Sequence, residues 1–146
     1  MRPRPAVIEQ LLLPGSVAAE IMAHARAALP HEACGLLAGS RSDGRATEFH
    51  PARNEHSSAL RYSVDPDDLV RIVFTIEGAG ADLLAIVHSH VGSSAVPSAT
   101  DVREARYPDA LQVIASLADP DAAPVLRLRA WRVGEGAPTE VPIVIG

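Results

Sequence analysis

Apolar residues recur every three to four positions in one segment near the start of the chain, which predicts an amphipathic helix. Val17, Ile21 and Ala25 lie on one face of this helix, and Pro30 ends the pattern. Ser16 follows a Pro-Gly pair and is the expected N-terminal cap, because a serine hydroxyl can accept a hydrogen bond from a free backbone N–H of the first turn.

Two further helices begin at clear start signals. Asp65 is expected to cap the second helix, with Pro66 in its first position and two more carboxylates near the positive end of the helix dipole. The glycines of 78–80 end this helix. Ser98-Ala-Thr-Asp101 fits a capping box and predicts a short helix that extends to about Arg106.

The other apolar stretches predict strands. Residues 34–38 and 45–50 flank a turn-forming segment and are expected to form a hairpin, whereas 51–63 has no regular pattern. Leu83–Val87 is apolar throughout, which is typical of a central strand that is covered on both faces. Three more strands are expected over 111–117, 125–133 and 141–145. The order predicts an α/β fold in which a mixed sheet lies between helices, as a single domain over 1–146.

Composition narrows the classes of function. The net charge is −5, which argues against nucleic acid or an anionic membrane as a partner. All 13 basic residues are arginines, so chemistry that needs a lysine nucleophile or base is excluded. Cys34 is the only cysteine, which excludes an intrachain disulfide and zinc sites built from several cysteines. No segment has the length of a signal peptide or a membrane span, and we expect a cytoplasmic protein.

A set of polar residues stands where a buried strand ends. His88 and His90 are two residues apart, so in an extended strand both imidazoles point to one side. Asp101 lies at the start of the third helix, where the chain could return to them. Two imidazoles and one carboxylate are a ligand set typical of catalytic zinc, which keeps one position for water. Glu32 is the candidate carboxylate that takes a proton from that water.

Each of these residues also has a simpler interpretation. A strand-end histidine is often a structural residue, Asp101 alone fits a helix cap, and Glu32 alone could be a solvated loop residue. Cys34 could be a nucleophile, but its apolar strand favours a buried, inert thiol. The pair His31-Glu32 begins like the motif His-Glu-x-x-His, yet position 35 is glycine. The joint pattern favours the metal centre, while the other histidines are interpreted as ordinary residues.

The same positions resemble the JAMM motif of the MPN/Mov34 metallopeptidases. Glu32 precedes Cys-Gly-Leu-Leu, and His88-Ser-His90 is followed after seven residues by Ser98 and then, two residues later, by Asp101. The resemblance covers nearly the whole chain and implies the JAMM/MPN, cytidine-deaminase-like fold. It implies one zinc ion per chain on His88, His90 and Asp101, with Glu32 as general acid and base and Ser98 as a donor to the oxyanion.

Longer stretches, including 30–39 and 97–102, are similar to those of actinobacterial hydrolases that release cysteine from a ubiquitin-like sulfur-carrier protein. The expected partner is therefore a carrier that ends in Gly-Gly, and a homodimer is plausible for the family. Val91 is a departure, because many JAMM proteins have proline after the second histidine; it affects the expected loop shape and substrate preference. Two alternatives stay open: a JAMM isopeptidase with another substrate, and a non-catalytic MPN scaffold.

Overall fold

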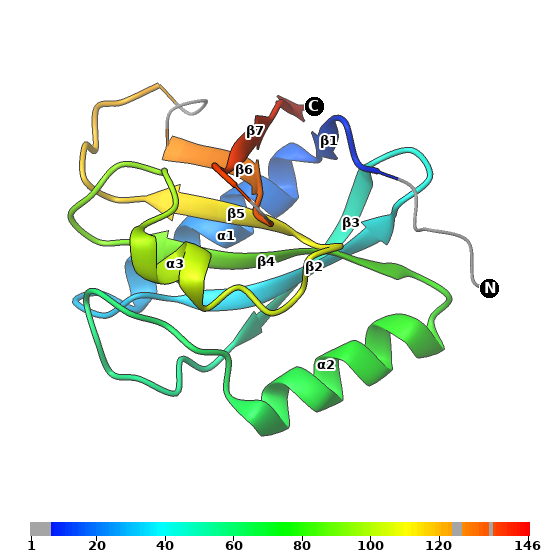
Figure 1. The fold of residues 1–146 in the computed structure, drawn as a ribbon, viewed down its shortest axis with the longest axis horizontal. Coiled ribbons are helices and arrows are strands. Elements are labelled where there is room, and N and C mark those ends of the chain that lie inside the picture. Colours follow the sequence, from blue (N-terminus) through cyan, green and yellow to red (C-terminus); the bar gives the residue numbers. More distant parts are fainter. Residues whose placement is uncertain (1–6, 124–126, 135) are drawn as a thin grey trace.

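The computed structural model describes residues 7–123, 127–134 and 136–146, and shows one sheet with helices on both of its faces (Figure 1). The helices are α1 (Gly15–Ala27), α2 (Pro66–Gly78) and α3 (Ala99–Arg103). The strands are β1 (Leu11–Leu13), β2 (Cys34–Ser40), β3 (Arg45–Ala52), β4 (Asp82–His90), β5 (Leu111–Ser116), β6 (Leu128–Arg132), β7 (Thr139–Val141) and β8 (Ile143–Ile145). Among the described residues, no helix has the length and apolar character needed to cross a membrane.

The eight strands form one mixed sheet in the order β7-β6-β5-β4-β2-β3-β1-β8. β4 pairs with β5 in parallel, and β1 pairs in parallel with β3 and β8, whereas the other neighbours are antiparallel. The predicted hairpin of β2 and β3 is present. The prediction of an α/β fold with a mixed sheet is therefore confirmed.

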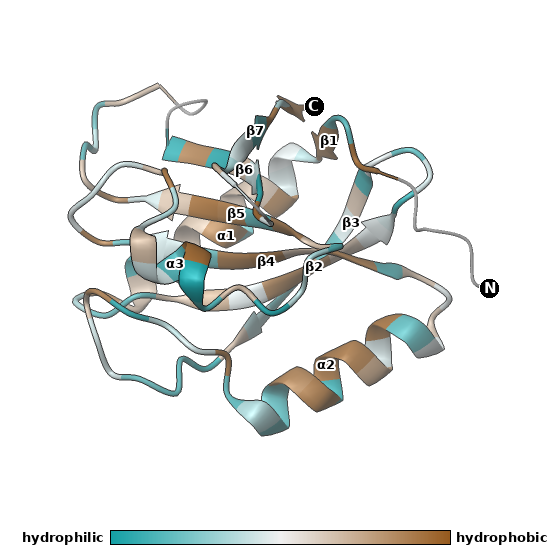
Figure 2. Ribbon diagram, in the orientation of Figure 1, coloured by the Kyte–Doolittle hydropathy of each residue, from teal (hydrophilic) through white to brown (hydrophobic). Residues whose placement is uncertain are grey.

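The central strands β4 and β5 are buried on both faces, and Figure 2 shows apolar residues along both. On one face, the apolar side of α1, including Ile21, packs over residues such as Val87 and Val113. On the other face, Ile72 and Ile76 of α2 belong to a second core cluster. Since both faces are covered, a polar side chain at the end of β4 is enclosed by protein.

The start of α2 follows the expected chemistry. The side chain of Asp65 accepts a hydrogen bond from the backbone N–H of Asp68, Pro66 is the first helical residue, and the first turn is acidic. Ser16 does not have the expected role at α1, which begins at Gly15 after Pro14 and has no side-chain cap. The backbone N–H of Gly15 instead donates to the carbonyl of Gly146, so contact with the end of the sheet replaces the cap.

Several predicted bounds are wrong. Leu11–Leu13, which the apolar pattern did not single out as a strand, is β1, because it pairs with two distant segments. The segment 141–145 was expected to be one strand, but Pro142 separates β7 from β8. The helix that starts after Ser98 ends at Arg103. Of the expected strand 125–133, residues 128–132 form β6, while 125 and 126 lie outside the described residues.

The two edge strands of the sheet, β7 and β8, are joined in the chain by a single residue. β7 pairs with β6 at one edge of the sheet, and β8 pairs with β1 at the other, yet only Pro142 separates them in the chain. One residue spans only a few ångströms, so the edges must lie close together. Two hydrogen bonds tie this region: Leu11 donates its N–H to the Pro142 carbonyl, and Arg132 donates to the Ile8 carbonyl. The sheet is consequently curled almost into a closed barrel.

Candidate metal centre

The two histidines of β4 lie on the same face of the sheet, as the strand period requires. β4 extends to His90, so the apolar strand and the His-x-His segment are one element. His88 is 1% exposed and His90 is 5% exposed, and their ring centroids are 5.2 Å apart. Their ring nitrogens therefore belong to a buried cluster at the strand end.

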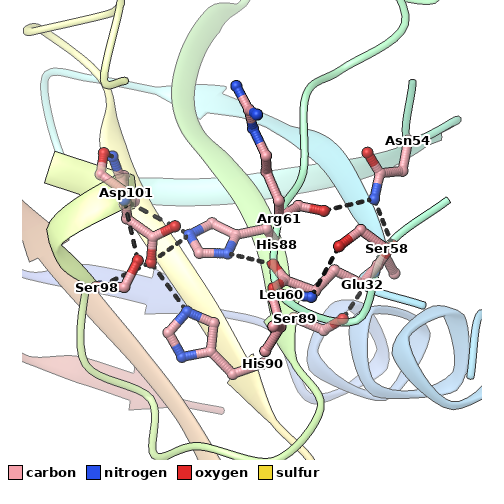
Figure 3. A network of polar contacts seen from close by, with 12 residues as sticks. Glu32, Asn54, Ser58, Leu60, Arg61, His88, Ser89, His90, Ser98 and Asp101 are labelled. Atoms are coloured by element: carbon pink, nitrogen blue, oxygen red, sulfur yellow. Dashed lines mark hydrogen bonds and ion pairs between the residues drawn. The ribbon is translucent and has the colours of Figure 1, made fainter. Parts of the chain in front are cut away.

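Helix α3 brings Asp101 to these imidazoles (Figure 3). Its Oδ2 atom lies 2.9 Å from Nε2 of His90 and 3.9 Å from Nε2 of His88. The predicted capping box is present: the backbone N–H of Ser98 donates to Asp101 Oδ2, and the N–H of Asp101 donates to Ser98 Oγ. The Asp101 carboxylate therefore takes part in the cap of α3 and also lies beside the two histidines.

Glu32 approaches the cluster from the segment before β2. Its side chain is 4% exposed, and its Oε1 atom lies 3.7 Å from Nδ1 of His88. Neither of these two atoms has a hydrogen-bond partner among the residues that the structure describes. The backbone around Glu32 is fixed, because its N–H donates to the carbonyl of Ser58 and its carbonyl accepts from the amide of Asn54. Two buried polar atoms without partners are costly, so a group bound by both of them would stabilise the site.

The electrostatics of the cluster favour positive charge beside Asp101. Burial alone would lower the pKa of His90, but its hydrogen bonds to Asp101 and to the Ser94 carbonyl outweigh burial and raise it. For Asp101, burial opposes ionisation, yet the bond from His90 and the charge of His88 lower its pKa to about 2. The Asp101 carboxylate is therefore ionised, so it can accept a hydrogen bond or bind a cation.

Two residues that the sequence did not single out contact His88. Tyr62 stacks on its ring, with centroids 4.2 Å apart and planes at 14°. The Nε2 atom of His88 lies 3.4 Å from Oε1 of Gln112, whose amide nitrogen donates to the Asp101 carbonyl. A glutamine inside the apolar β5 was a visible signal that could have been noticed. Tyr62 gave no such signal, because it lies within the irregular segment 51–63.

Glu32, His88 and His90 can each offer a ligand atom, and these atoms lie within 4.8 Å of one another. The expected ligand set instead combined the histidines with Asp101, which is close enough for direct contact with His90. The structure thus brings all four expected side chains together, and two carboxylates compete for the role of ligand. Ser98 completes the group beside Asp101.

A cavity of about 120 Å³ borders the cluster. Asp101, Gln112 and Tyr62 line it on the side of the cluster, and Leu69 of α2 and Glu104 line it as well. An ion pair of 2.7 Å between Arg61 and Glu104 links the irregular segment to the end of α3. Of the four clustered side chains, Asp101 is the one that lines this cavity.

Cys34 is not part of this chemistry. It is 1% exposed, and its Sγ donates to the carbonyl of Arg53. Burial, followed by the charges of nearby carboxylates, raises the pKa of its thiol to about 12. The thiol is therefore buried and protonated, as expected. His24, another histidine assigned no role, donates its Nε2–H to the backbone carbonyl of Cys34 at 2.9 Å.

Comparison with known proteins gives consistent matches. Residues 14–134 match the family model for prokaryotic homologs of the JAB domain. The chain is 34% identical over 140 residues to a CysO-cysteine peptidase of Mycobacterium tuberculosis (96% of this chain and 94% of that protein), and 39% identical over 101 residues to a desampylase of Haloferax volcanii (66% and 73%). The solution structure of protein DSY2949 from Desulfitobacterium hafniense superposes with a TM-score of 0.83 at 32% identity, covering 93% of this chain and 92% of that one.

Proposed function

Because this chain belongs to the family of prokaryotic homologs of the JAB domain, we propose that it is a zinc hydrolase that cleaves the bond after the C-terminal Gly-Gly of a ubiquitin-like sulfur-carrier protein and releases cysteine or a similar amine. The chain is a JAMM-type hydrolase, as its named peptidase relatives indicate. The observation that carries the finer proposal is the buried convergence of Glu32, His88, His90 and Asp101 beside a cavity.

The donor set fits a zinc ion. His88 and His90 with the carboxylate of Asp101 would hold it, since neutral imidazoles and one carboxylate are common ligands of catalytic zinc. Nε2 of His88 and Nε2 of His90 are the ring nitrogens that lie toward Asp101 Oδ2, at 3.9 and 2.9 Å. The orphaned His88 Nδ1 instead lies beside the orphaned Glu32 Oε1, and these buried atoms also need a partner, so an ion bound between them would have Glu32 as its carboxylate ligand. When bound, zinc supplies Lewis acidity and lowers the pKa of a coordinated water toward about 7.

Glu32 is assigned as general base and acid. Within the described part of the chain its Oε1 makes no hydrogen bond and has only Nδ1 of His88 nearby, at 3.7 Å, so it can accept a proton from the attacking water and return it to the leaving nitrogen. The carbonyl and N–H of Glu32 are both hydrogen-bonded, which fixes the backbone from which the carboxylate projects. A fixed backbone with a carboxylate that is not hydrogen-bonded to the described residues is suited to proton transfer.

Ser98 is assigned as the donor to the oxyanion. Its Oγ atom accepts the Asp101 N–H at 3.0 Å, so the hydroxyl hydrogen is not needed for the cap. That hydrogen can be donated to the negative charge that develops on the substrate carbonyl oxygen. The carrier tail is proposed to bind in an extended form along a strand edge, with Gly-Gly reaching the centre because larger side chains would not fit. A complex with a folded tail would contradict this.

The proposal can be tested with metal analysis and a carrier adduct that ends in Gly-Gly-Cys. We expect about one zinc per wild-type chain and a mass loss that corresponds to release of cysteine. Glu32→Ala should keep zinc and lose turnover, whereas His88→Ala should lose both. Loss of zinc from Glu32→Ala but not from Asp101→Ala would show that Glu32 is the ligand. A Glu32→Ala variant as active as the wild type would overturn the acid–base assignment.

A second candidate, cleavage of a ubiquitin-like modifier from a lysine side chain, is favoured by the similarity to a desampylase. The two candidates share the metal centre and differ in the leaving group. Rates with a Gly-Gly-Cys adduct and with a Gly-Gly-lysine isopeptide on the same carrier separate them. A clear preference for the isopeptide would replace the first candidate.

A further inference from the structure

We propose that Trp131 and Ser116 are positioning residues for the metal centre, which hold the loop after β4 so that the Ser94 carbonyl fixes the ring of His90. The inference rests on the proposed function, in which His90 is a zinc ligand. It concerns residues that lie outside the motif and on other strands. The loop in question comprises residues 91–97 and joins β4 to the cap of α3.

Three successive carbonyl groups of this loop each accept a hydrogen bond from a side chain. The Ser93 carbonyl accepts from Ser116 Oγ at 2.6 Å, and the Ala95 carbonyl accepts from Trp131 Nε1 at 2.8 Å. Between them, the Ser94 carbonyl accepts from Nδ1 of His90 at 2.8 Å. The carbonyl that orients the histidine is thus flanked on both sides by tethered neighbours.

The two tethers come from rigid parts of the sheet. Ser116 is the β5 residue paired with His90 in the parallel register, so it lies directly beside the ligand. Trp131 of β6 is 9% exposed, and its ring belongs to a small core cluster that includes the fully buried Ala95. The guanidinium group of Arg129 stacks 4.8 Å from the centre of the same ring. Motion of the indole or the hydroxyl is therefore restricted by packing.

The loop itself contributes little rigidity. Gly92, Ser93 and Ser94 are exposed, and Val91 stands where a proline would restrict the backbone. A histidine ligand needs a hydrogen bond at its other nitrogen to fix the ring and its tautomer. With Nδ1–H bonded to the Ser94 carbonyl, Nε2 of His90, which donates to Asp101 in this structure, is the nitrogen that would bind a cation after giving up its hydrogen. The hydrogen bonds from Ser116 and Trp131 therefore restrict a loop backbone that the residues of the loop do not restrict themselves.

The test compares Ser116→Ala, Trp131→Phe and the double variant with the wild type, using zinc affinity measured by competition with a chelator. Each single variant should bind zinc about tenfold more weakly, in the range found for outer residues of metal sites. Because both tethers fix one segment, the double variant should lose less than the product of the two single effects. Leu128→Ala is the matched control. Leu128 of β6 is buried in the core cluster beneath α1, so this substitution should lower stability without removing a contact to the loop.

A second readout is the His90 Nδ1–H proton resonance of the zinc-loaded protein, which a general loss of stability would not move. We expect it to be protected from exchange in the wild type and the Leu128→Ala control, and to exchange rapidly in the tether variants. Ser116→Thr, which keeps the hydroxyl, should restore both affinity and protection. If Trp131→Phe does not fold, the comparison of Ser116→Ala with Ser116→Thr tests the positioning role by itself.

The failures of the two proposals are distinguishable. Wild-type protein that binds no zinc would overturn the proposed function. Wild-type protein that binds zinc, together with tether variants of unchanged affinity and unchanged Nδ1–H exchange, would overturn only the positioning role. Equal weakening in the Leu128→Ala control would also overturn it, since the effect would then follow stability.

Discussion

The hydroxyl group of Ser98 can take part in two hydrogen bonds, because it accepts one from the Asp101 N–H and keeps a hydrogen to donate. Replacement by alanine removes both functions. We expect Ser98→Ala to slow turnover by a factor that corresponds to about 2.7–4 kcal/mol of barrier. Ser98→Thr should retain most of the rate, measured with the Gly-Gly-Cys adduct. Alanine turning over like the wild type would restrict Ser98 to the cap.

Cys34 allows a prediction about reactivity. Its pKa is raised to about 12, so below that pH the group is a neutral thiol and not a reactive thiolate. At pH 8, native protein should resist alkylation by iodoacetamide, while protein unfolded in denaturant should react fully. Mass spectrometry of the two samples over time gives the comparison. Rapid labelling of the native protein at pH 8 would contradict the buried, protonated state.

The spacing of residues in the sequence predicted which polar side chains come together at the site, but it did not predict the residues that contact them. The two-residue period of a strand put His88 and His90 on one side, and the capping box placed Asp101 at a helix start. No local rule links Gln112 or Tyr62 to His88, because their contacts arise from strand order and from the path of an irregular segment. Their roles could be seen only once distant segments were placed together.

Among the elements, the hairpin of β2 and β3 depends on a close approach of two backbones. A Cβ atom at Gly35 would lie 2.5 Å from the ring of Phe49 and 2.6 Å from the His50 carbonyl. Gly35→Ala should therefore lower the free energy of unfolding by about 1–3 kcal/mol through overpacking. Denaturant unfolding measures the change.

Gly78, the last residue of α2, is the control for this substitution. A Cβ atom at this position would meet nothing within 4 Å, so Gly78→Ala should raise stability by about 0.5–1 kcal/mol. Similar effects of the two alanines would indicate that β2 and β3 are not packed as closely as described.

The elements with strong local signals were predicted, whereas those defined by distant pairing were not. α2 begins where Asp65 and Pro66 indicated, since capping is a property of adjacent residues. β1 has only three residues and becomes a strand because β3 and β8 lie on either side of it. β7 and β8 are separate strands because they pair at opposite edges of the sheet. The apolar pattern of 141–145 does not indicate which edge a residue joins.

For the whole molecule, a ligand that binds the folded state shifts the unfolding equilibrium. The proposed zinc site draws its residues from segments that are distant in the chain, so the unfolded chain has no preformed site. Zinc at about 100 times its dissociation constant should stabilise the protein by about 2.7 kcal/mol and raise the Tm by about 5–10 °C. A chelator should reverse the shift and abolish hydrolysis. His88→Ala should show no zinc-dependent change in Tm, and a similar rise in that variant would place the ion elsewhere.

The single residue between β7 and β8 has a consequence for how the molecule is made. Synthesis proceeds from the N-terminus, and β1 emerges early, yet one of its two neighbours is supplied by residues 143–145. Until those residues leave the ribosome, β1 presents an unpaired row of backbone groups that another chain could join. The nascent protein is therefore most exposed to misassembly just before this segment leaves the ribosome, when the other strands have emerged and almost every other contact of the sheet can already form.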